Sequence, residues 1–83
     1  METESQRLFG HLLQDCESAL KHERRKAMAE LFAEGEPDIA FDSLLENLND
    51  AGFTPSDQVR ADLTRLAQML GAENHPIGKQ YYI

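Results

Sequence analysis

Cysteine, tryptophan, proline and glycine are scarce in this sequence, and their scarcity excludes several classes of protein. The 83 residues contain one Cys, no Trp, three Pro and five Gly. A single cysteine cannot form an internal disulfide or a cysteine-based zinc site. No apolar run approaches the roughly 18 residues that span a bilayer, and the acidic start Met1-Glu2-Thr3-Glu4 does not resemble a secretory signal. We therefore expect a cytoplasmic protein without a membrane partner.

Positive charge is also in short supply. Eight Lys and Arg residues stand against fifteen Asp and Glu residues, which gives a net charge of −7. Phosphates would be repelled by this excess, so we expect no direct binding to nucleic acid. Hydrophobic residues make up 41% of the chain and charged residues 28%, a composition typical of globular proteins. Residues 1–83 are long enough for one domain and too short for two.

Apolar residues recur at helical spacing throughout most of the chain, which predicts an all-α fold. The pattern favours a small bundle of three or four short amphipathic helices. No Gly or Pro interrupts the polar stretch 21–26, so residues 4–34 form either one helix or two. The predicted helices cover about residues 4–20, 23–34, 37–51 and 55–70, followed by an irregular tail at 71–83.

Glycines and prolines mark the predicted helix ends. Gly35 is expected to end a helix in the left-handed conformation, and Pro37 suits the first position of the next helix. Thr54 is predicted to cap the last helix, with Pro55 at its first position and Asp57 completing a capping box. The residues predicted to form the core are Leu12, Leu13, Cys16, Met28, Leu31, Phe41, Leu44, Leu45, Leu48, Leu63, Leu66 and Leu70.

The sequence contains no recognisable catalytic or metal-binding pattern. His11, His22 and His75 are far apart and none belongs to a metal-ligand motif. Cys16 lies at the centre of an apolar stripe, where a free cysteine usually packs as a small hydrophobic residue. We therefore expect no catalytic residue, no cofactor and no metal, and the protein is predicted not to be an enzyme.

Negative charge is concentrated in the middle of the chain. Between Ala27 and Val59 there are eight acidic residues and no Lys or Arg, so this window carries −8 and the remaining residues sum to +1. Four of these acids follow one another at intervals of four residues. Like charges at this spacing destabilise a helix by about 0.2–0.5 kcal/mol per pair. The face that contains them is predicted to bind a partner, and its residues are Asp38, Ile39, Asp42, Glu46, Asn49 and Asp50.

This acidic face, as we call these six residues, has two interpretations. Charge runs commonly form a solvated surface that does no more than keep a protein in solution. Alternatively, the acids attract a basic partner electrostatically, and Ile39 supplies an apolar contact beside them.

Two other segments, one basic and one containing tyrosines, have side chains that could contact either the chain itself or a partner. The basic cluster Lys21, Arg24, Arg25 and Lys26 is expected to pair with neighbouring acids such as Glu17 and Glu30 rather than with phosphate. Tyr81 and Tyr82 either fold back onto the bundle or contact a partner, because tyrosine is common both in cores and at interfaces.

The segment from Phe32 to Leu48 resembles a known pattern. Its Gly35-Glu36-Pro37 turn precedes a helix with Ala40, Leu44 and Leu48, and a second helix follows after Thr54-Pro55. This arrangement, over about residues 24–71, resembles the MafI-like small helical immunity proteins of bacterial polymorphic toxin and contact-dependent growth inhibition systems. The resemblance implies an antitoxin that binds and neutralises a cognate toxin domain.

The charge pattern suggests what kind of toxin this would be. A nuclease-type toxin domain has a basic surface that holds phosphates, which an acidic inhibitor complements. The alternative function is a non-catalytic helical adaptor or regulatory module that acts by homodimerisation or by binding another protein. A toxic module encoded next to this chain would favour the antitoxin.

Overall fold

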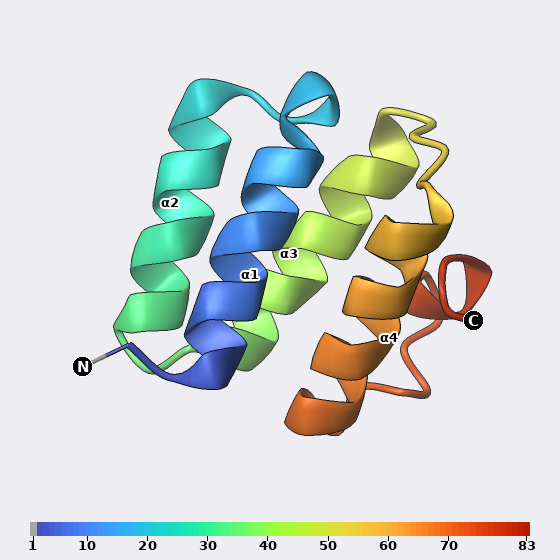
Figure 1. The fold of residues 1–83 in the computed structure, drawn as a ribbon. Coiled ribbons are helices and arrows are strands. Elements are labelled where there is room, and N and C mark those ends of the chain that lie inside the picture. The colour runs from blue at the N-terminus through green and yellow to red at the C-terminus, as the bar shows by residue number, and fades with distance from the viewer. Residues whose placement is uncertain (1) are drawn as a thin grey trace.

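The computed structural model describes residues 2–83, and all regular structure within that range is helical (Figure 1). The predicted all-α class is therefore confirmed. The elements in chain order are α1 (Glu4–Asp15), the 3-10 helix η1 (Glu17–Ala19), α2 (His22–Ala33), α3 (Pro37–Asp50), α4 (Asp57–Leu70) and the 3-10 helix η2 (Gly78–Gln80).

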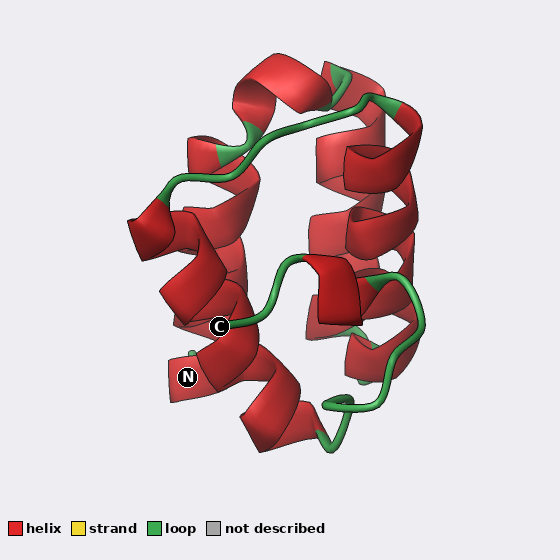
Figure 2. Cartoon of the chain, turned by 90° about the vertical axis from the view of Figure 1, so that its right-hand side faces the viewer, coloured by secondary structure: helices red, strands yellow, loops and turns green. Residues whose placement is uncertain are grey.

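The four α-helices pack as two pairs around one core. α2 packs mainly against α3, and α1 packs mainly against α4. In Figure 1 the tail lies beyond α4, on the side away from α2. Figure 2 looks onto this side and shows η2 and its flanking loops lying across it. Hydrogen bonds between the tail and side chains of both α3 and α4 hold it there.

The stretch 4–34 forms two α-helices, and the first ends earlier than predicted. α1 stops at Asp15, η1 follows, and Leu20 is extended before α2 begins at His22. A continuous helix over residues 4–33 would be about 45 Å long at 1.5 Å per residue. The longest dimension of the molecule is 30 Å. The chain therefore has to turn, and the turn buries Cys16 and Leu20.

The start of α4 also differs from the prediction. Ser56, and not Thr54, is the N-cap, and its Oγ accepts a hydrogen bond of 3.2 Å from the backbone N–H of Val59. Asp57 is consequently the first residue of the helix and cannot complete a capping box. Pro55 precedes the cap. At the other end Gly71 adopts φ 69°, the left-handed conformation typical of a helix C-terminus.

The core contains most of the predicted residues and several others. Leu31 and Leu70 are only partly buried, so they lie at its margin. Phe9 and Phe32 stack with ring centroids 4.6 Å apart and join α1 to α2. The buried hydrophobic residues outside the predicted core are Phe9, Leu20, Phe32, Ala40, Val59, Ala67 and Tyr81.

The lengths and compositions of the helices bear on membrane insertion. Over residues 2–83, none is both long enough and apolar enough to cross a bilayer.

Candidate partner-binding surface

The acidic face lies on α3, and most of it is open to solvent. Asp38, Glu46, Asn49 and Asp50 are exposed, and Ile39 is 55% exposed. Successive residues of an α-helix are about 100° apart, so Ile39 and Glu46 point almost directly away from the buried side of α3. Asp42 lies to one side of them and is partly buried. The structure therefore brings the six predicted residues onto one side of one helix.

Ile39 is an apolar side chain among carboxylates. Asp42 follows it by three residues and Glu46 by seven, and residues at these spacings share a side of a helix. The exposed large hydrophobic residues within the described part of the chain are Ile39, Met69 and Ile83. Ile39 alone of these belongs to the acidic window. It therefore has the position that an apolar contact at a charged interface would have.

Asp42 is bound by the tail. Its Oδ1 lies 2.5 Å from Nε2 of His75. The other ring nitrogen of His75, Nδ1, accepts hydrogen bonds of 3.2 Å from the backbone N–H groups of Ile77 and Gly78. Because Nδ1 is an acceptor, the neutral ring carries its proton on Nε2 and donates it to Asp42. One of the four acids of the face thus has a structural partner.

The remaining acids of α3 differ in their surroundings. Asp50 lines a pocket of about 260 Å³ together with Lys21 and Arg24, although neither forms an ion pair with it in residues 2–83. Within residues 2–83, neither Asp38 nor Glu46 has a basic side chain within 4.0 Å. In residues 2–83, Asp38 and Glu46 are therefore the acids of the face that neither accept a side-chain hydrogen bond nor share a pocket with basic residues; Asp38 directly precedes Ile39, and Glu46 lies two turns beyond it.

Asn49 borders a different hollow. This pocket, of about 360 Å³, lies between the end of α3, the start of α4 and the tail. Arg60 closes one side of it and is fixed by two bonds of 3.0 Å, from Nε to the carbonyl of Tyr81 and from Nη2 to the carbonyl of Tyr82. The residues that line it are Asn49, Gly52, Phe53, Thr54, Pro55, Arg60, Gln80 and Tyr81.

The tyrosines of the tail fold back onto the bundle, which is the first of the two arrangements considered for Tyr81 and Tyr82. Tyr81 is buried, and the hydroxyl of Tyr82 donates a 3.0 Å hydrogen bond to the carbonyl of Ala72. The hydroxyl also lies directly over Gly78, where a Cβ atom would collide with it. Burial raises the pKa of Tyr82 to about 12, and the nearby charge of Glu73 contributes to the rise. Burial also raises the pKa of Tyr81.

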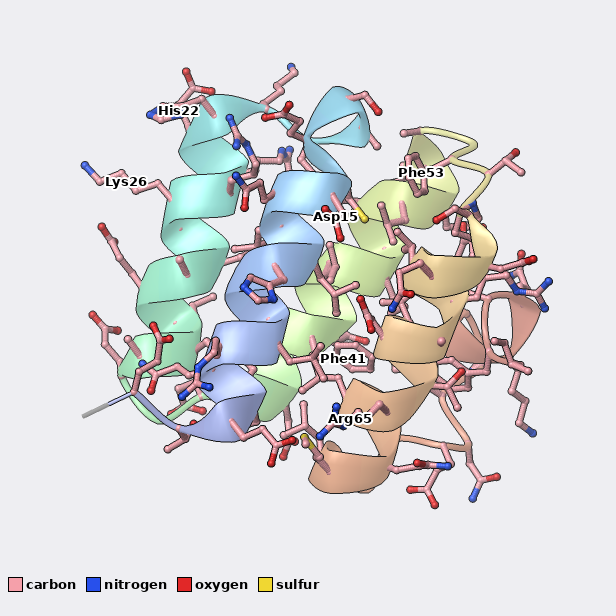
Figure 3. All side chains as sticks on the ribbon, viewed as in Figure 1. Asp15, His22, Lys26, Phe41, Phe53 and Arg65 are labelled. Atoms are coloured by element: carbon pink, nitrogen blue, oxygen red, sulfur yellow. The ribbon has the colours of Figure 1, made fainter. Side chains whose placement is uncertain are left out.

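The basic cluster pairs within the chain only in part. Nη1 of Arg25 lies 3.7 Å from Oε2 of Glu17, as expected. The expected pairing with Glu30 is absent from the part of the chain that the structure describes. In Figure 3, His22 and Lys26 project outward from α2 into solvent. Most of the cluster is thus a solvent-facing basic patch on the helix next to α3.

Cys16 has the packing role predicted from its position. It is fully buried, and burial, aided by the charge of Asp15, raises the pKa of its thiol to about 11. The thiol is therefore protonated at neutral pH and unreactive as a nucleophile. No three His, Cys, Asp or Glu side chains between residues 2 and 83 are grouped so that they could hold a metal ion.

Two side chains that shape this surface were not predicted from the sequence. His75 and Arg60 determine where the tail lies, and their partners are 33 and 21 or 22 residues away in the chain. A helical pattern cannot signal contacts of this kind, because it describes only neighbours within one element.

The chain was compared with family models, curated proteins and solved structures. None of the three comparisons finds a match.

Proposed function

We propose that the protein is a non-catalytic antitoxin that binds a basic toxin domain through the acidic face of α3. The observation that carries the proposal is the exposed Ile39 between Asp38 and Glu46, whose charges have no basic partner in residues 2–83. An apolar contact surrounded by unpaired charge is suited to an interface with a rim of opposite charge.

The charge distribution indicates how such binding would occur. The negative potential of the window from Ala27 to Val59 attracts a basic domain from a distance and raises the association rate. If the toxin is a nuclease, Asp38 and Glu46 would occupy the positions of substrate phosphates. Ile39 would then be desolvated at the centre of the contact, which slows dissociation.

The face is also mechanically suited to binding. It lies on a 14-residue helix whose inner side is anchored by buried residues such as Phe41 and Leu48. Its side chains are therefore presented on a rigid element, and binding requires little ordering of the backbone.

The test is rescue of growth. A toxic module encoded beside this chain is expressed with the wild-type protein, with Asp38→Lys/Glu46→Lys, or with a control, Glu2→Lys/Glu73→Lys, that changes the net charge equally. The proposal predicts rescue by the wild type and the control but not by the face variant. Rescue by all three would show that the face is only a solvated surface. The absence of any neighbouring toxic module would favour the adaptor instead.

A further inference from the structure

A second surface lies between α1 and α2, and its character is opposite to that of the acidic face. This α1/α2 groove has a volume of about 420 Å³. We call its apolar lining residues, Gly10 and Leu13 of α1 and Ala29 of α2, the floor, and its basic lining residues, His22, Arg25 and Lys26, the rim; Gln14 also lines it. An apolar floor with a basic rim is thus present on a chain whose net charge is −7.

Gly10 is unusual within this groove. It lies inside α1, where glycine is less favourable than alanine. A Cβ atom at this position would meet no other atom within 4 Å, so packing within the chain does not require a glycine. The missing side chain leaves the floor of the groove open for an incoming group.

The acidic face has the chemistry that this groove would accept. Ile39 is an apolar side chain flanked by Asp38 and Glu46, while Gly10 and Leu13 form an apolar floor beside Lys26. We propose that the α1/α2 groove of one molecule binds the acidic face of a second copy. Ile39 of one copy lies on the floor of the groove, and Glu46 meets the basic rim of the other.

This arrangement has a definite symmetry. The groove lies between α1 and α2, and the face lies on the outer side of α3, behind α1 in Figure 1. Two copies cannot easily make both contacts with each other at once, so the contact is head-to-tail and produces rings or open chains rather than a closed two-fold dimer. The net charge of −7 makes copies repel one another at long range. The association is therefore weak and depends on local complementarity. It needs no toxin, so it is independent of the proposed function, although a bound toxin would compete for the same face.

Two variants test the two surfaces of the proposed contact separately. Gly10→Leu/Lys26→Glu fills the groove and reverses its rim but leaves the face intact. Ile39→Lys/Glu46→Lys removes the face but leaves the groove intact. A control matched to the face variant, Met69→Lys/Glu73→Lys, makes the same charge change at exposed positions outside both surfaces. Circular dichroism establishes that each variant is folded.

The measurement is sedimentation velocity of the purified proteins at about 0.1 M ionic strength, where the Debye length is about 10 Å. The wild type and the control are expected to exceed the mass of a dimer as concentration rises. Each interface variant alone remains a monomer, and an equimolar mixture of the two forms a 1:1 dimer, because one intact groove and one intact face remain. A wild type that stays monomeric up to about 1 mM, or a mixture that stays monomeric, would overturn the proposal.

Discussion

Asp42 and His75 lie 33 residues apart in the chain, and their side chains meet at 2.5 Å between Oδ1 and Nε2. The histidine side chain is 16% exposed and the aspartate side chain 50%. The bond therefore joins an open surface of α3 to a packed tail. A change at Asp42 acts on both the acidic face and the tail, so Asp38 and Glu46 are the better positions for testing the face alone.

Replacing His75 with alanine should loosen the tail. The substitution removes a hydrogen bond to a carboxylate and two from backbone N–H groups. Because Asp42 is half exposed, we expect a loss of about 1–2 kcal/mol in the free energy of unfolding. Urea unfolding followed by circular dichroism measures it, with His11→Ala at an exposed position as the control. Equal midpoints for the two variants would show that the bond contributes nothing.

The stability of the fold should fall in alkali. The pKa of Tyr82 is raised from its ordinary 10.0 to about 12, so the native state holds this proton more tightly than the unfolded state does. The contribution of the neutral hydroxyl is complete below pH 10 and is lost as the pH rises toward 12. Unfolding midpoints of the wild type and of Tyr82→Phe, measured between about pH 8 and pH 11, should converge. If the midpoints of the two proteins changed in parallel with pH, the loss of stability would not come from ionisation of Tyr82.

Ser56 and Thr54, which both precede α4, should respond differently to truncation. Ser56→Ala removes the bond to the N–H of Val59 and should cost about 1 kcal/mol of stability. Thr54→Ala should change stability by less than about 0.5 kcal/mol, because Thr54 does not cap the helix. Thermal unfolding of the two variants distinguishes them. A larger loss of stability for Thr54→Ala would indicate that Thr54 caps the helix, as predicted from the sequence.

Truncation of the core side of α3 should affect folding as a whole. Phe41 and Leu48 are 1% and 0% exposed. Replacing either with alanine leaves a cavity and should cost about 2–5 kcal/mol. Such a loss would unfold much of a domain this small. The check is the urea midpoint, and a shift corresponding to less than about 1 kcal/mol would mean that the core rearranges to fill the space.

The sequence predicts the helices best where glycine and proline mark their ends. Pro37 begins α3 and α4 ends at Leu70, both as predicted, and Gly71 caps α4 in the left-handed conformation. The end of α1 has no such signal, because neither residue type occurs between Gly10 and Gly35. It is determined by tertiary packing, which turns the chain at Cys16 so that Leu20 can be buried.

The position of the acidic face on the outer side of α3 was predictable from the spacing of residues within one helix. Helical spacing alone places Glu46 opposite Phe41, and the structure exposes the first and buries the second. Spacing within one helix cannot show that the tail occupies Asp42, because His75 belongs to an aperiodic segment. The exposure of the face thus follows from local periodicity, while its division into paired and unpaired charges follows from tertiary contacts.

The affinity of Asp38→Lys/Glu46→Lys for the purified basic toxin domain, measured by titration calorimetry at two ionic strengths, tests the proposed function most directly. Circular dichroism provides the control for folding. We predict at least a tenfold weaker Kd than for the wild type, equivalent to about 1.4 kcal/mol, with the larger difference at the lower ionic strength. A folded variant that binds as tightly as the wild type at both ionic strengths would contradict the proposal that α3 is the toxin-binding surface.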